Sequence, residues 1–592
     1  MTRIRVWAPG ARRVQLESGG HRLDMTGHDS GWWSADAPFI THGVDYAFRV
    51  DGDGPFPDPR APWQPDGVDG PSRWVDHGRF SWSDGGWQQV PLESAVIYEL
   101  HVGTFSPEGT FDGTAKRLDH LAGLGVTHVE LMPVAEFSGR RGWGYDGVDL
   151  YAPHHAYGGP EGLKRLVDAC HRRGLAVLLD VVYNHLGPAG NHLGRFGPYF
   201  TGRYATPWGE AVNLDGPGSD EVRRFFIENA LMWLEDYHGD GLRIDAVHAF
   251  LDTSAVHFLE ELAGEVARLK ARLGRHLVLI AESALNDPRV VRPPETGGYG
   301  LDAQWNEDFH HALHALLTGE RNGYYRDFGR LADLADTLTR GFAYDGRYSA
   351  YRRRRHGRPA GDLPAHRFVG CLQNHDQVGN RALGERTSRL LSPEKLKIGA
   401  ALVMTAPFVP MLFQGEEWAA STPFLYFTDH GDPELAEAVR TGRRREFAPF
   451  GWDPAVIPDP QAEETFLRSR LDWGERAREP HRDLLAWHRA LIGLRRRFPD
   501  LADGRFNRVT VNFDERDKWL TMARGTVLVA CNFGERDVEV PWTDPGKREI
   551  VLASSETVTA RRGGIRLPGP SVAIVTGDGE TRRRENGQEE RK

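Results

Sequence analysis

Residues 175–185 read Leu-Ala-Val-Leu-Leu-Asp-Val-Val-Tyr-Asn-His, a continuous apolar run that ends in polar side chains. Such a run is typical of a strand in a parallel sheet that is covered on both faces. Seven further segments have the same character, and amphipathic patterns separate them. They are Ala95–Phe105, Val126–Val134, Gly241–His248, His276–Ser283, Leu301–Phe309, His366–Asp376 and Val409–Glu417. Eight β/α repeats predict an α/β fold built on a TIM (β/α)8 barrel.

Helical patterns lie between these strand candidates. Ser219–His238 places its large apolar side chains, among them Phe225, Phe226 and Trp233, along one stripe. Ser392-Pro393 offers an N-cap followed by proline at the first helical position. Both patterns predict helices that cover the outside of the barrel.

Sequence patterns typical of strands lie on both sides of the predicted barrel. Short runs such as Arg3–Trp7 alternate with turns, which predicts an N-terminal β-sandwich of the carbohydrate-associated type over residues 1–90. The catalytic barrel is expected over 91–500 and a C-terminal antiparallel β domain over 501–576. Residues 577–592 are charged and polar with nothing to bury, so we expect a disordered tail there.

The charge balance excludes a dedicated nucleic-acid-binding protein. The 592 residues carry 73 Lys and Arg against 83 Asp and Glu, a formal net charge of −10, with no long basic run to neutralise phosphates. Three cysteines cannot form a disulfide framework, and neither a signal peptide nor an apolar run long enough to span a bilayer is found. We therefore expect a cytoplasmic protein without membrane contacts.

Carboxylates stand where predicted strands end, at Asp180, Asp245, Glu282 and Asp376. Each one alone is more simply a turn former or a helix N-cap, but the carboxyl ends of barrel strands are where active sites form, so four together favour a site. Arg243 lies two residues before Asp245 and shares its strand face, which favours the ionised carboxylate.

Several carboxyl groups around one barrel mouth, without metal-ligand spacing, indicate glycoside chemistry. One carboxylate must stay charged to attack the anomeric carbon, and another must hold a proton for the leaving oxygen. Asp245 beside Arg243 suits the first role. Glu282 follows the apolar run Leu277–Ala281 and suits the second.

Four segments resemble the signature regions of the α-amylase superfamily of retaining glycoside hydrolases, in the same order: Asp180–His185, Gly241–His248, the Glu282 strand and Asn374–Asp376. The resemblance implies Asp245 as nucleophile, Glu282 as general acid/base and Asp376 as the third carboxylate, which binds the distorting sugar ring. It implies no cofactor, and we assign no metal. Substrate contacts are expected from Tyr145, His185, Arg243, His248, Asn374, His375 and Gln377.

A finer resemblance is to the maltooligosyltrehalose trehalohydrolases of that superfamily. It is carried by Tyr98–Phe105, Arg140–Gly158, Phe196–Phe200 and Gln373–Arg381. It implies hydrolysis of the α-1,4 bond next to the terminal trehalose of maltooligosyltrehalose, and a pathway link to a synthase that makes this substrate.

Two alternatives remain open from the sequence. The first is an α-glucan branching or debranching enzyme, although Gln377 in Asn374-His-Asp-Gln377 favours the hydrolase because branching enzymes usually carry Glu there. The second is a non-catalytic glucan-binding protein, since a barrel can keep its fold after losing its chemistry.

Some aromatic side chains could also contact sugar. Trp208, Trp305 and Trp418 lie near strand ends or in loops, where stacking on a sugar and buried packing are equally expected. His154 and His155 could line the cleft, with a turn or packing role at least as plausible.

Overall fold

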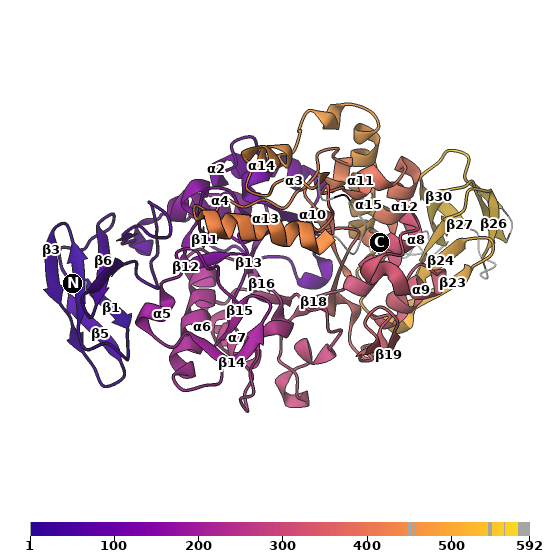
Figure 1. Ribbon diagram of the computed structural model, residues 1–592. Helices are drawn as coiled ribbons and strands as arrows, with labels where there is room; N and C mark the ends of the chain where they lie inside the picture. The colour runs from indigo at the N-terminus through magenta and orange to yellow at the C-terminus, as the bar shows by residue number, and fades with distance from the viewer. Residues whose placement is uncertain (1, 448–452, 454–455, 543–547, 562, 578–592) are drawn as a thin grey trace, which may run out of the picture.

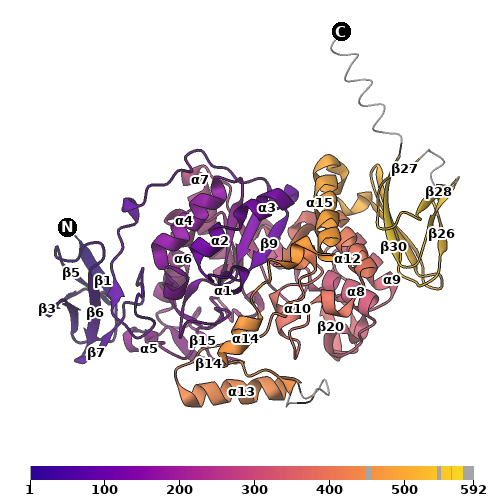
Figure 2. The same cartoon turned by 90° about the horizontal axis from the view of Figure 1, so that it is seen from above.

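The computed structural model describes residues 2–447, 453, 456–542, 548–561 and 563–577. The molecule is elongated, with β-rich ends on either side of a central barrel (Figures 1 and 2). The N-terminal sheets lie at the indigo end and the C-terminal sheets at the yellow end. Of the tail that was expected to be disordered, residues 578–592 lie outside the described part of the chain.

Eight parallel strands of the described chain close into a barrel, which confirms the predicted fold class. The strands follow one another around the barrel in chain order, and the first pairs with the last. They are β9 (Ile97–Leu100), β10 (His128–Leu131), β13 (Ala176–Val181), β16 (Gly241–Ile244), β17 (Val278–Ala281), β18 (Ala303–Trp305), β21 (Phe368–Cys371) and β22 (Val409–Phe413).

The strands are buried along their whole length because helices cover one face and barrel packing covers the other. In β13, Leu178 belongs to a small apolar cluster with Ile280 and Met411. Its neighbours Val177 and Leu179 belong instead to the large core that includes the helices. Alternate residues of one strand therefore serve two different cores.

Helices follow most of the barrel strands along the chain, and several of them surround the barrel in Figure 2. In α6, Val222, Phe225, Phe226, Trp233 and Leu234 are buried as the stripe predicted. The predicted N-cap is present in α12, where the Ser392 side chain accepts from the Lys395 N–H and proline follows at the first helical position. The main covering helices are α3 (Leu118–Leu124), α4 (Gly159–His171), α6 (Ser219–Glu235), α7 (Phe258–Leu273), α8 (Glu307–Thr318), α9 (Leu331–Arg340), α12 (Pro393–Thr405) and α15 (His481–Arg497).

Antiparallel sheets form both ends of the molecule. At the N-terminus the strand orders are β1-β5-β4 and β3-β2-β6-β7, and at the C-terminus β23-β24-β25-β30-β27 and β26-β29-β28. The N-terminal strands are β1 (Arg3–Trp7), β2 (Val14–Ser18), β3 (His21–Asp24), β4 (Thr26–Gly27), β5 (Trp32–Asp36), β6 (Asp45–Val50) and β7 (Asp53–Phe56). The C-terminal strands are β23 (Val509–Asp514), β24 (Trp519–Arg524), β25 (Val527–Asn532), β26 (Val538–Pro541), β27 (Arg548–Ala553), β28 (Thr559–Arg561), β29 (Gly564–Leu567) and β30 (Ser571–Gly577).

No helix in the described ranges is both long enough and apolar enough to cross a membrane.

Candidate active site

The three predicted catalytic carboxyl groups follow strands of the barrel. Asp245 comes directly after β16 and Glu282 directly after β17. Asp376 lies in the first turn of α10 (His375–Gly379), shortly after β21. Because all barrel strands run in parallel, these positions share the carboxyl-terminal rim.

Arg243 holds two carboxylates at once. Its Nη1 lies 2.7 Å from Oδ1 of Asp245 and 2.9 Å from both carboxylate oxygens of Asp180. The guanidinium is fully buried, and the ring of Trp305 lies 4.3 Å from it. Charge-assisted hydrogen bonds of this kind are strong in a buried setting and fix the Asp245 carboxylate in place.

Tyr145 and His375 form a second part of the rim. The Tyr145 hydroxyl donates to Oδ2 of Asp180 at 2.6 Å and lies 2.8 Å from Nε2 of His375. Nδ1 of His375 is 2.5 Å from Oε1 of Glu99, a residue of β9. Burial alone would lower the pKa of His375, but the charges of Glu99 and Asp376 raise it to about 9. His375 is therefore a cation at neutral pH.

The Glu282 carboxyl is anchored next to Asp245. Its Oε2 accepts from the backbone N–H of Ala246 at 2.7 Å. Ala246 has φ +40°, a left-handed conformation that is unfavourable for a residue with a Cβ and is found at functional sites. Burial raises the pKa of Glu282 well above its ordinary value, against the opposing effect of Arg243. The raised pKa favours the protonated form of Glu282, the form that a general acid requires.

Asn374 and Gln377 cap α10. The Asn374 side-chain oxygen accepts from the backbone N–H groups of Asp376 and Gln377, and the Gln377 side chain accepts from the Asn374 N–H. This capping box holds the Asp376 backbone in position. Asn374 is buried by these contacts, whereas Gln377 also lines a hollow beside Asp376.

Two hollows are each lined by a residue that contacts His375. The first, here called the acid-side hollow, is lined by Glu307, Tyr324, Arg352, Asp376 and Gln377, among others. The second, here called the aromatic hollow, is lined by Tyr145, His185, Phe200, Trp208 and Tyr426, among others. Tyr145 of one hollow and Asp376 of the other lie 2.8 and 3.6 Å from Nε2 of the same histidine.

The remaining predicted contacts differ in setting. His185 stacks on Trp208 at 4.5 Å between ring centroids, and 47% of Trp208 is exposed. His248 is exposed and lines a third hollow with Leu285 and Tyr299. Of the three tryptophans, Trp305 and Trp418 are buried, which assigns them to packing.

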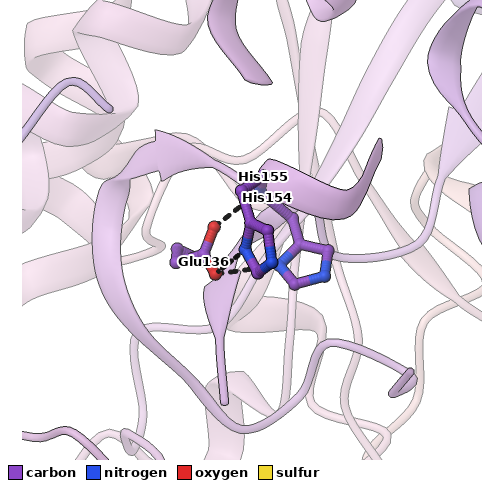
Figure 3. Close-up of side chains that lie close together, drawn as sticks. All are labelled: Glu136, His154 and His155. Atoms are coloured by element: carbon purple, nitrogen blue, oxygen red, sulfur yellow. Dashed lines mark hydrogen bonds and ion pairs between the residues drawn. The ribbon is translucent and has the colours of Figure 1, made fainter. Parts of the chain in front are cut away.

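His154 and His155 both bond Glu136 (Figure 3). Oε1 of Glu136 lies 3.1 Å from Nδ1 of His154 and 2.7 Å from Nδ1 of His155. Glu136 lies in β11 (Ala135–Phe137), and His154 and His155 directly follow β12 (Gly147–Pro153). Within the described residues this is the cluster whose side chains could hold a metal ion. Hydrogen bonds already use the carboxylate and one nitrogen of each ring.

Three acidic residues at the site, Glu99, Glu130 and Glu307, were not predicted from the sequence. Glu99 and Glu130 stand inside buried strands, where a charged side chain in an apolar run was a usable signal. Burial raises the pKa of Glu130 well above its ordinary value, and the charge of Glu99 adds to this effect. Glu307 follows the sixth barrel strand, so the strand-end signal that selected Glu282 applies to it as well.

Comparisons with known proteins agree with this geometry. Residues 73–193 match the family model "Alpha amylase, catalytic domain", and residues 504–574 match a domain of unknown function, DUF3459. Malto-oligosyltrehalose trehalohydrolase from Arthrobacter ramosus is 53% identical, with 97% of this chain and 99% of the relative covered. The enzyme of that name from Rhizobium sp. (strain M-11) is 49% identical, with 97% of each chain covered. The chain belongs to the malto-oligosyltrehalose trehalohydrolase family.

Family membership makes this chain a glycoside hydrolase of the α-amylase superfamily. A crystal structure of a Salmonella typhimurium protein, described as an alpha amylase, superposes with a TM-score of 0.89 at 39% identity and 97% coverage of both chains. Membership of the trehalohydrolase family rules against a protein that only binds glucan. An α-glucan is the substrate class of the family.

Proposed function

We propose that this trehalohydrolase cleaves the α-1,4-glucosidic bond next to the terminal trehalose of maltooligosyltrehalose, releasing trehalose and a maltooligosaccharide. The observation that carries the proposal is the position of Glu282 beside the Arg243-bound carboxylate of Asp245. The Glu282 carboxyl group accepts from the backbone N–H of Ala246, the residue after Asp245, and burial raises its pKa, which favours the protonated acid. The family name supports the choice of substrate.

In the first step of the proposed mechanism, a carboxylate oxygen of Asp245 attacks the anomeric carbon. The bond to the leaving oxygen breaks, its electron pair goes to that oxygen, and Glu282 transfers a proton there. In the second step Glu282, now a carboxylate, removes a proton from water, and the water oxygen displaces Asp245. Asp376 and cationic His375 would bind hydroxyl groups of the distorted ring.

The two hollows suggest how the substrate lies. The leaving group must depart on the side of the acid, and the acid-side hollow includes Glu307, which is hydrogen-bonded to Glu282. We therefore assign trehalose to this hollow. The glucan chain would lie in the aromatic hollow, where the exposed face of Trp208 and the polar groups of Tyr145 and His185 suit a sugar's mixed surface.

A hydrolase of this specificity needs a supplier, so we propose a functional link to a synthase that forms the α,α-1,1 linkage at a glucan end. A cytoplasmic location is proposed from the three free cysteines, all buried. The antiparallel sheets before and after the barrel support a domain division at about residues 90 and 500.

The proposal is tested by incubating the protein separately with maltooligosyltrehalose and with maltohexaose and analysing the products. We expect free trehalose from the first and little cleavage of the second. New α-1,6 branches in amylose would select a branching enzyme, and cleavage of α-1,6 bonds would select a debranching enzyme. Equal cleavage of both linear substrates would overturn the trehalose specificity.

A further inference from the structure

Glu307 places a fourth carboxyl group in the active site. It is the first residue of α8, directly after β18 and the N-cap Asn306. Its side chain lines the acid-side hollow together with Asp376 and Arg352. Its carboxyl group is hydrogen-bonded to the carboxyl group of Glu282.

A hydrogen bond between two carboxyl groups requires a proton, because two carboxylates offer only acceptors. The Ala246 N–H, 2.7 Å away, already donates to Oε2 of Glu282. The donor to the Glu282–Glu307 contact must therefore be one of the two acids. Like charges this close raise the affinity of the pair for its first proton.

More negative than positive side chains face the Glu282–Glu307 pair. Glu282 faces Arg243, Asp245 and Asp376 as well as Glu307. The charged groups that face Glu307 are Glu282, Asp376, Asp308 and Arg352. Burial, with the charges of Asp376 and Asp308, raises the pKa of Glu307 to about 7, against the opposing effects of Arg352 and of the hydrogen bond to Glu282.

We infer that Glu307 is a positioning residue that shares one proton with Glu282 and keeps this proton available for the leaving oxygen. When Glu282 gives the proton to that oxygen, both carboxyl groups become anionic. The charge of Glu307 then makes Glu282 the stronger base that must remove a proton from water in the second step. The inference rests on the proposed function, since it refines the role of the same acid.

The test is the pH dependence of kcat/KM for trehalose release in Glu307→Gln. Glutamine keeps the size of the side chain but removes its charge, so Glu282 should lose its proton at lower pH. We expect the alkaline limb of the profile to move down by about one pH unit. Glu307→Asp retains the charge, so its alkaline limb should lie close to that of wild type. Glu394→Gln, an exposed glutamate in the first turn of α12, is the matched control and should leave the profile unchanged.

An activated substrate separates proton supply from folding. Fluoride leaves without a proton, so kcat/KM for α-maltosyl fluoride should change less than twofold in Glu307→Gln. On the alkaline limb, kcat/KM for trehalose release should fall by up to about tenfold, the limit that a shift of one pH unit sets. An unchanged alkaline limb, or equal losses on both substrates, would overturn the inference. If wild type releases no trehalose, the proposed function fails. The role of Glu307 is then tested on a glucan that the wild type does cleave. The same downward shift of the alkaline limb of kcat/KM is expected in Glu307→Gln.

Discussion

Nη1 of Arg243 lies 2.7 Å from Oδ1 of Asp245, and the two residues are separated by a single position along the chain. The guanidinium is fully buried while part of the Asp245 side chain stays exposed. The cation therefore holds the carboxylate from within the barrel and leaves its other side open to a substrate. This arrangement fits a nucleophile that must be charged and reachable.

Replacing Asp245 with asparagine should abolish turnover while leaving the fold intact. The amide cannot form the glycosyl ester, so we expect kcat for trehalose release to fall by about 10³-fold or more. The far-ultraviolet circular dichroism spectrum should match that of wild type. Asp220→Asn, at an exposed position in the first turn of α6, serves as a control. Activity within tenfold of wild type in Asp245→Asn would remove Asp245 from this role.

The proton on His375 should stabilise the folded protein. Its pKa is about 9 in the folded state against an ordinary 6.5, so this stabilisation is fully present below about pH 6.5 and is lost as the pH rises through 9. We expect His375→Gln to lower the free energy of unfolding by about 3 kcal/mol more at pH 6 than at pH 10. Urea titrations at the two pH values measure the difference. An equal loss at both would show that the bond to Glu99 does not hold a proton.

Trp208 should contribute to binding of the glucan chain and not to the chemical step. It lies between β14 (Phe200–Thr206) and β15 (Gly209–Val212), with an exposed ring that stacks on His185. Trp208→Ala should raise KM by about tenfold, which corresponds to about 1.4 kcal/mol of binding, and leave kcat within about twofold. Trp208→Tyr keeps an aromatic face and should recover most of the affinity. A loss confined to kcat would contradict this role.

Arg524 should tie the C-terminal sheets to the barrel. From β24 it donates to the carbonyl oxygens of Thr405, Ala406 and Leu501 at 2.8, 2.7 and 3.1 Å. Removing it takes one donor from each of these buried carbonyl groups, so Arg524→Ala should lower the free energy of unfolding by about 2–4 kcal/mol. The exposed Arg516→Ala is the control. Equal melting temperatures for the two variants would exclude the contribution expected of Arg524.

The barrel could be predicted from the sequence because each strand has a recognisable pattern within its own segment. A strand covered on both faces is apolar throughout, and β13 lies inside the predicted Leu175–His185 segment for this reason. Outside the barrel, β1 coincides with the predicted Arg3–Trp7 run. The predicted segments extend beyond the ends of the observed strands. Gly241–His248, for example, contains the strand Gly241–Ile244 and then a turn, because the left-handed Ala246 breaks the extended backbone.

The site could be predicted only in part. Asp245, Glu282 and Asp376 carry a pattern within their own segments, and the resemblance names them. The pairing of Glu307 with Glu282, and of Glu99 with His375, joins residues on different strands, so no local pattern contains it. Asn374 looked like a sugar contact, yet its side chain caps α10, a competing use that sequence spacing does not distinguish.

The central claim is that Asp245 carries the covalent intermediate while Glu282 supplies and removes the proton. Mass spectrometry of Glu282→Gln treated with α-maltosyl fluoride tests it most directly. Fluoride departs without an acid, but the missing base slows attack by water, so the glycosyl-enzyme should accumulate. The account predicts one maltosyl group on the protein, located on the peptide that contains Asp245. A label on another residue, or an unlabelled enzyme that turns the fluoride over with inversion, would contradict it.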